Sequence, residues 1–226
     1  MKKDKLERML EAMMSTGADF AEVYVEDKKT TIFNYIDSNL DSYSTNFSNG
    51  VGLRIAKGTD VYYASTNDFT NKNINKIIDT LCSNISNKKT YKYVSLNRVK
   101  RYNNLSKTHY TNEDVKALFN LLDKKIRSKD KRINQVSISL QNNKQGVTIA
   151  RENGLFTFEQ RERTRLFIIV SFKDKDKTCN INYSYGLTTG LDLLDKINYD
   201  EVIDTLVKEG IDKLYAVLCI GGEMPV

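Results

Sequence analysis

Residues 6–26 read LERMLEAMMSTGADFAEVYVE, and the spacing of their apolar side chains changes once. Up to Met14 the apolar residues recur three and four positions apart, which is typical of an amphipathic helix, and Gly17 is a natural C-cap. From Ala21 onward apolar and polar residues alternate, as in a strand with one buried face. A helix followed directly by alternating strands predicts an α+β unit.

The chain then follows one order of elements twice. In the first half, the expected elements are helices at 4–16 and 74–85 and strands at 21–26, 30–36, 51–55 and 61–63. Asn49-Gly50 is a turn signal ahead of the third strand, and Lys57-Gly58 is expected to close the hairpin into the fourth. Residues 1–86 therefore form the predicted N-terminal α+β domain.

The second half begins with Thr111-Asn112-Glu113-Asp114, which resembles a capping box at the start of a helix. The expected elements are helices at 111–126 and 199–217 and strands at 136–140, 147–149, 155–170 and 179–185. Asn153-Gly154 marks a tight hairpin, and Gly210 is expected to weaken the last helix. Residues 111–220 form the predicted middle domain. The expected fold class is thus α+β, with two consecutive α-β-β-β-β-α units whose antiparallel sheets are covered by helices.

The basic charge of the chain is concentrated in one segment. The 35 basic and 29 acidic residues give a net charge of +6, but residues 87–110 contain seven cations and no acid. Tyr91, Tyr93, Tyr102 and Tyr110 are interleaved with these cations. Phosphates are attracted by such charges and bases stack on such rings, so a single-strand-binding interpretation has a physical basis. We favour a solvated basic linker, because the segment has little periodicity and no known nucleic-acid-binding motif accompanies it.

Reactive side chains are few. His109 is the single histidine, whereas a zinc hydrolase uses two or three and a Ser-His-Asp unit needs its histidine beside a nucleophile. We expect a solvated loop residue there. Cys82, Cys179 and Cys219 are widely spaced and form no Cys-x-x-Cys pair, which excludes a disulfide framework and a cysteine zinc site. Cys82 and Cys179 are expected to be small core residues. No catalytic, cofactor-binding or metal-binding residue is assigned.

The sequence also argues against a membrane protein. The longest dense apolar run, residues 166–170, is far shorter than the roughly 20 residues that a membrane helix needs. The charged N-terminus is followed by no apolar stretch that would indicate a signal peptide. We therefore expect a soluble, cytoplasmic protein.

Two further patterns concern possible binding. Residues 50–52 (Gly-Val-Gly) lead into a strand, so they form neither a P-loop nor a dinucleotide fingerprint, and they predict a bulge or a close backbone approach. Three arginines alternate along a strand and share one face: Arg161, Arg163 and Arg165. That face could bind a carboxylate or a partner, although Glu159 and Glu162 favour ordinary surface pairing.

Several short motifs occur in a characteristic order. They are Ala18-Asp19-Phe20-Ala21-Glu22-Val23-Tyr24-Val25-Glu26, Gly50-Val51-Gly52-Leu53-Arg54, Tyr63-Ala64-Ser65-Thr66-Asn67, Asn153-Gly154 with Arg163-Thr164-Arg165-Leu166, and Gly222-Glu223-Met224-Pro225-Val226. The first three resemble the first domain of the TldD/PmbA family, the fourth resembles its middle domain, and the last resembles the segment that opens its C-terminal domain. The pieces in the first domain look closer to the TldD side than to the PmbA (TldE) side.

The resemblance implies a metallopeptidase, historically called a modulator of DNA gyrase. Such proteins work as two-subunit assemblies that cleave small or unfolded peptides. The family's zinc ligands come from a His-Glu-x-x-x-His motif and a later cysteine in the C-terminal domain. No residue of this sequence matches them, so none is carried over, and no cofactor is expected in this chain.

We therefore expect the N-terminal scaffold, assembly and peptide-guiding region of a TldD-like zinc metallopeptidase, inactive alone, with residues 221–226 opening a further C-terminal domain. The expected partners are a PmbA/TldE-type subunit or a second copy, and a small or unfolded peptide. Nucleic acid and membrane are not favoured. Two alternatives stay open: a nucleic-acid-binding module that uses the linker at 87–110, and a natural non-catalytic subunit.

Overall fold

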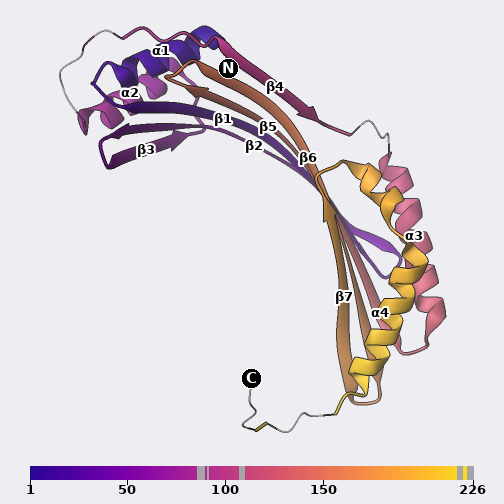
Figure 1. Ribbon diagram of the computed structural model, residues 1–226. Coiled ribbons are helices and arrows are strands. Elements are labelled where there is room, and N and C mark those ends of the chain that lie inside the picture. The colour runs from indigo at the N-terminus through magenta and orange to yellow at the C-terminus, as the bar shows by residue number, and fades with distance from the viewer. Residues whose placement is uncertain (86–89, 91, 107–109, 218–220, 223–226) are drawn as a thin grey trace. The chain divides into compact units, whose positions relative to one another are not determined.

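A computed structural model describes residues 1–85, 90, 92–106, 110–217 and 221–222 (Figure 1). Its elements are α1 (Lys3–Met14), β1 (Phe20–Ile36), β2 (Asn39–Lys57), β3 (Asp60–Thr66), α2 (Asn71–Ser83), β4 (Arg98–Asn104), α3 (Asn112–Lys129), β5 (Ile133–Arg151), β6 (Leu155–Asp174), β7 (Lys177–Leu187), the 3-10 helix η1 (Leu191–Lys196) and α4 (Tyr199–Leu214). Helices pack on a sheet whose sequential strands form antiparallel hairpins, which confirms the α+β class.

The seven strands form one sheet in the order β3-β2-β1-β5-β6-β4, and β7 also pairs with β6. β4 runs parallel to the first part of β6, from Arg98 opposite Leu155 to Asn104 opposite Arg161. β7 runs antiparallel to the remainder of β6. The expectation of purely antiparallel sheets is therefore wrong for β4.

Two predicted interruptions of the strands are absent. Residues 27–29 and 141–146 continue β1 and β5, so each strand is a single long element where the sequence predicts two. β1 and β5 are neighbours, and their polar side chains interact there, as between Thr30 Oγ1 and Asn143 Oδ1 at 2.8 Å. The pairing of β1 with β5 continues through these residues, because hydrogen bonds between strand backbones do not require an apolar face.

Two further expectations need correction. Asn49-Gly50 lies inside β2 and is not a turn. Residues 87–110 are not simply a linker, since 98–104 form β4. All seven side chains of β4 are exposed, so the strand has no apolar alternation to detect.

The segment just before β4 packs on α1. The backbone N–H groups of Val94 and Leu96 donate to carboxylates of α1, and both side chains are buried.

Two compact units divide the chain, and both are discontinuous in sequence. Unit 1 comprises residues 1–30, 45–105 and 143–162, and unit 2 comprises residues 31–44, 106–142 and 163–226. This differs from the sequential division into 1–86, a linker and 111–220. The difference arises because β1, β2, β5 and β6 are long enough to contribute to both units.

In unit 1, α1 and α2 cover one face of the strands (Figure 1). The predicted stripe of α1 is confirmed, because its five apolar residues between Leu6 and Met14 are buried. The core residues are Leu6, Met9, Leu10, Met13, Met14, Ala18, Ala21, Val23, Val51, Leu53, Ile55, Ile74, Ile78, Leu81, Cys82, Val94, Leu96 and Ala150. The predicted hairpin after Lys57 is also confirmed, since Lys57 pairs with Asp60.

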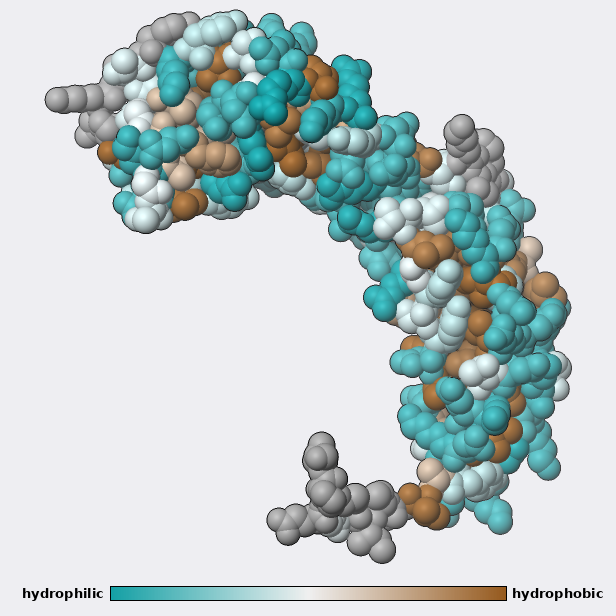
Figure 2. Space-filling view, in the orientation of Figure 1, coloured by the Kyte–Doolittle hydropathy of each residue, from teal (hydrophilic) through white to brown (hydrophobic). Residues whose placement is uncertain are grey.

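In unit 2, α3, η1 and α4 cover the strands (Figure 1). Thr111 and Asp114 form the predicted capping box at the start of α3. The core includes Phe33, Tyr35, Val115, Phe119, Leu122, Ile126, Val136, Ile138, Leu140, Leu166, Ile168, Val170, Phe172, Leu193, Leu194, Ile203, Leu206 and Leu214. Exposed ion pairs, such as Lys125 with Asp200 at 2.9 Å, join α3 to α4. The surface over these two helices is largely hydrophilic (Figure 2).

Candidate functional site

The sheet face of unit 1 that points away from α1 and α2 carries a cluster of polar and aromatic side chains. We call it the open face. Side chains along a strand point alternately to its two faces. Ala21, Val23 and Leu53 belong to the core under the helices, so the residues next to them in sequence point to the open face. The open face contains Phe20, Glu22, Tyr24, Glu26, Gly52, Arg54, Tyr63, Gln145, Arg151, Glu159 and Arg161.

One end of the open face combines two arginines with a single carboxylate. Arg54 Nη2 lies 3.0 Å from one oxygen of Glu22, and Arg151 Nε donates to the other at 2.7 Å. The ring of Phe20 lies beside both guanidinium groups, with its centroid 5.1 Å from the Arg54 Cζ and 5.7 Å from the Arg151 Cζ. This group has one positive charge in excess, so it suits an anionic or carbonyl-rich ligand.

A second group surrounds Glu26. Its Oε2 accepts hydrogen bonds from the hydroxyl of Tyr24 at 2.6 Å and from Nε2 of Gln145 at 2.8 Å. Burial, together with the hydrogen bond to this carboxylate, raises the pKa of Tyr24 to about 12. Tyr24 therefore remains a phenol donor at neutral pH, and it holds Glu26 in place rather than acting as a base.

A groove runs beside this group, and its floor depends on a glycine. The phenol of Tyr63 lies over Gly52, so closely that a Cβ at position 52 would be 2.7 Å from the Tyr63 hydroxyl oxygen. The cavity has a volume of about 330 Å³ and is lined by Tyr24, Glu26, residues 48–52, Tyr63 and residues 65–67. We call it the glycine groove. The close approach predicted for Gly50-Val51-Gly52 is confirmed at Gly52.

The open face is suited to binding rather than to bond cleavage. Ser48, Ser65 and Thr66 line the glycine groove together with the carboxylate of Glu26, which is already engaged by Tyr24 and Gln145. A hydroxyl nucleophile needs an adjacent general base within hydrogen-bond reach. The groove therefore offers neutral hydrogen-bonding groups, backbone and aromatic walls, which suit a polar, extended ligand.

Two of the three alternating arginines, Arg161 and Arg165, have separate surroundings. Arg161 donates to Glu159 at 2.5 Å, as surface pairing predicts, and this hydrogen bond is the main reason that the pKa of Arg161 is raised. Arg165 donates to Ser184 at 2.8 Å, and its guanidinium lies 4.5 Å from the ring centroid of Phe167. Glu162 lies on the opposite, buried face, where it pairs with Lys144 at 3.5 Å.

Cys82 lies in the core, as expected, whereas Cys179 lies at the margin of the core, and neither is arranged for reaction. Cys82 is buried in unit 1, and the half-buried Cys179 has its thiol 3.3 Å from the carbonyl oxygen of Gly210. Burial raises the pKa of the Cys179 thiol, which lowers its thiolate content. His109 and Cys219 lie outside the described residues.

Metal-binding side chains do not converge in the described part of the chain. Within residues 1–85, 90, 92–106, 110–217 and 221–222, no three His, Cys, Asp or Glu side chains are grouped so that they could hold a metal ion. The donors present there do not fit a zinc site. Over the same residues, the helices are too short or too polar to span a bilayer.

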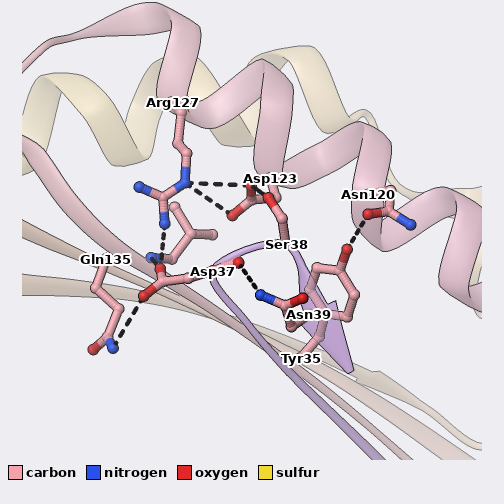
Figure 3. A network of polar contacts seen from close by, with 9 residues as sticks. Tyr35, Asp37, Ser38, Asn39, Asn120, Asp123, Arg127 and Gln135 are labelled. Carbon is pink, nitrogen blue, oxygen red and sulfur yellow. Dashed lines mark hydrogen bonds and ion pairs between the residues drawn. The ribbon is translucent and has the colours of Figure 1, made fainter. Parts of the chain in front are cut away.

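A second polar network, in unit 2, fixes the turn between β1 and β2 (Figure 3). Asp37 and Ser38 have positive φ angles of 48° and 65°, a conformation that non-glycine residues rarely adopt. Ser38 donates to the fully buried Asp123, which also accepts from Arg127 Nε at 3.2 Å, and Arg127 pairs with Asp37. Every member of this network is engaged with another, so it serves the structure of the turn.

Comparison with known proteins gives two matches to family models. The model for PmbA/TldA metallopeptidase domain 1 matches residues 21–85, and the model for the PmbA/TldA metallopeptidase central domain matches residues 106–214. The first match includes β1, β2 and β3 of the open face. No curated protein matches the chain.

Several solved structures share the fold. A protein described as a modulator of DNA gyrase from Thermotoga maritima has a TM-score of 0.72 at 15% identity, over 98% of this chain and 50% of its own. A protein similarly described from Bacteroides thetaiotaomicron has a TM-score of 0.70 at 13% identity, over 93% and 49%. TldE from Thermococcus kodakarensis has a TM-score of 0.57 at 14% identity, over 93% and 46%.

The present chain thus spans about half the length of these structures. At such low identities the structural likeness shows a common fold. The two family models are matched in order and together cover well over half of the chain, and they agree with the motifs noted in the sequence. The chain therefore belongs to the PmbA/TldD metallopeptidase family.

Proposed function

We propose that this chain is the N-terminal scaffold, assembly and peptide-guiding region of a TldD-like zinc metallopeptidase that cleaves small or unfolded peptides. The observation that carries the proposal is the ordered match to the first and central domains of the family over residues 21–85 and 106–214. A partner subunit of the same family, of the PmbA/TldE type or a second copy, completes the proposed assembly. TldE is among the proteins that share the fold, which supports a same-family partner.

The proposal places the zinc outside the described residues. The family's His-Glu-x-x-x-His motif requires two histidines, and this sequence contains one. The described residues also lack a group of ligands that fits zinc. We therefore assign no step of peptide-bond cleavage to this chain, and its proposed contribution is to hold the peptide and the assembly.

The chain alone is accordingly expected to hydrolyse no peptide. Purified 226-residue protein would be incubated with zinc and a fluorescently labelled unfolded casein, beside a zinc peptidase of known activity as control. Bound metal would be measured by mass spectrometry after dialysis. Hydrolysis that a chelator abolishes, together with stoichiometric zinc in the protein, would contradict the assignment.

The edge strand β3 is the proposed peptide guide. β3 ends the sheet on one side, and its sequence, Asp60–Thr66, contains no Lys, Arg or Pro of the kind that commonly blocks strand addition. Val61 and Tyr63 are 61% and 65% exposed on this strand, and Tyr63 forms one wall of the glycine groove. An extended peptide could pair with the β3 backbone and place side chains along the groove.

Addition of an unfolded peptide is therefore expected to slow hydrogen exchange of the β3 amides. Val61→Lys puts a cation on this edge and is expected to abolish the added protection without changing the fold, because the side chain is exposed. Thr178→Lys, on the exposed start of β7, is the matched control and should leave the protection intact. Equal protection in both variants, or none in the parent chain, would refute guidance by β3.

A further inference from the structure

The opposite edge of the unit 1 sheet has different chemistry. β4, residues Arg98–Asn104, pairs with β6 and ends the sheet order there (Figure 1). All seven of its side chains are exposed. The strand carries Arg98, Lys100 and Arg101, and it belongs to the segment that holds the excess positive charge of the chain. We call these three cations, with Tyr102, the basic edge.

The cations of the basic edge have no acidic partner in the described part of the chain. Arginines elsewhere on the same sheet do, since Arg54 and Arg151 share Glu22 and Arg161 pairs with Glu159. No ion pair among the described residues includes any of the three cations of β4. Their positive potential is therefore uncompensated and directed to solvent.

The register of β4 sorts its side chains onto two faces. Val99 is opposite Phe156, which packs against the core under the helices, so Val99 and Arg101 lie on that side. Arg98, Lys100 and Tyr102 alternate on the other face, about 6.6 Å apart from one to the next because a strand rises about 3.3 Å per residue. Tyr102 is 49% exposed, and Tyr93, earlier in the same segment, is 70% exposed.

A simpler role accounts for only part of this pattern. Lys and Arg on an edge strand discourage the addition of another strand, so the cations could serve only to protect the edge of the sheet. Protection of the edge explains the charges but needs no exposed aromatic ring. Cations that attract phosphates, interleaved with rings on which bases stack, are the recurrent chemistry of single-strand nucleic-acid binding.

We propose that the basic edge binds single-stranded nucleic acid. The strand of nucleic acid runs along the sheet edge, where side chains of both faces of β4 are exposed, so Arg98, Lys100 and Arg101 contact phosphates and a base stacks on Tyr102. The binding is independent of base sequence, since phosphate contacts carry no sequence information and every base can stack on a ring. This inference stands apart from the proposed peptidase role, because it uses neither β3 nor a metal.

The test measures binding of a fluorescein-labelled oligothymidylate of about 20 nucleotides by fluorescence anisotropy, at a series of salt concentrations. For single strands, the slope of log K against log salt is about −0.7 per phosphate contacted. The triple variant Arg98→Gln, Lys100→Gln, Arg101→Gln is therefore expected to bind more weakly and to lose about two units of slope. The control variant Lys124→Gln, Lys131→Gln, Lys208→Gln removes the same charge from exposed positions in unit 2 and should keep the parental slope.

A second arm isolates stacking. Tyr102→Ala is expected to weaken oligonucleotide binding several-fold at constant salt, whereas Tyr102→Phe keeps the ring and should bind as the parent does. Circular dichroism and melting temperature confirm that each variant is folded. Any of three results would overturn the proposal. They are no binding of the oligonucleotide at low salt, an equal loss of affinity in the two triple variants, and equally tight binding of poly-glutamate.

Discussion

Asp123→Ala is expected to lower the free energy of unfolding by about 1.5–3 kcal/mol, the range for lost hydrogen bonds to a charged group, because Arg127 is partly exposed and still pairs with Asp37. Asp123 is 0% exposed, and it accepts hydrogen bonds from Ser38 and Arg127. Without it, Arg127 loses its partner on α3, and Ser38 loses the contact that helps to hold it at a φ of 65°. The turn between β1 and β2 then lacks its anchor. Urea unfolding followed by circular dichroism measures the loss.

The control for Asp123 is a carboxylate in an exposed pair on the neighbouring helix. Asp200 pairs with Lys125 at the surface, and Asp200→Ala should change stability little, because exposed pairs contribute little. Asp123→Asn keeps an acceptor for Ser38 and should fall between the parent and Asp123→Ala. If Asp123→Ala were as mild as Asp200→Ala, the network at the turn would not support unit 2.

Gly210→Ala is expected to destabilise the protein by about 2 kcal/mol, although alanine is the better helix former. The substitution gains about 1 kcal/mol in helix propensity. A Cβ at position 210 would, however, lie 2.1 Å from Cε2 of Phe172, a ring that is 1% exposed. Forcing extra atoms into a packed core costs up to about 3 kcal/mol, so the clash prevails.

A double variant identifies the cause. Phe172→Leu opens space beside Gly210, so Gly210→Ala should be tolerated better in that background, with a coupling of about 1 kcal/mol or more between the two sites. Thr205→Ala, at an exposed position of the same helix, should be neutral or slightly stabilising, because only propensity changes. Stabilisation by Gly210→Ala would show that α4 can move away from Phe172 on β6. Thermal and urea unfolding measure the parent and the four variants.

Local patterns predicted the α-helices and the turns after Lys57 and at Asn153-Gly154, but they misplaced a turn at Asn49-Gly50, which lies inside β2. The stripe ending at Met14, the capping box at Thr111 and the turn at Asn153-Gly154 each depend on a few neighbouring residues, and the structure confirms them. Gly210 illustrates the limit. The sequence predicted that Gly210 weakens its helix. The reason for a glycine at this position is the ring of Phe172, which lies on β6 and is distant in sequence.

The open face was predictable only in part. Gly52 was expected at a close backbone approach, although its partner, Tyr63, could not be named from spacing. Glu26 and Gln145 were missed as a pair because they come from β1 and β5, which are joined only by tertiary structure. Polar residues at alternate positions of a strand were the available signal, and that signal is common to any solvated sheet face. β4 was missed because full exposure removes the alternation that reveals a strand.

The interleaved composition of the two units has a consequence for biosynthesis. Unit 1 begins at residue 1, yet it needs residues 143–162 to complete its sheet. A nascent chain that has emerged from the ribosome only as far as α2 holds a partial sheet, because it lacks β5, which pairs with β1, and β6, which pairs with β5. Cooperative folding of unit 1 therefore waits until most of the chain has been translated, and a gene cut near codon 86 would encode an incomplete unit rather than a separable domain.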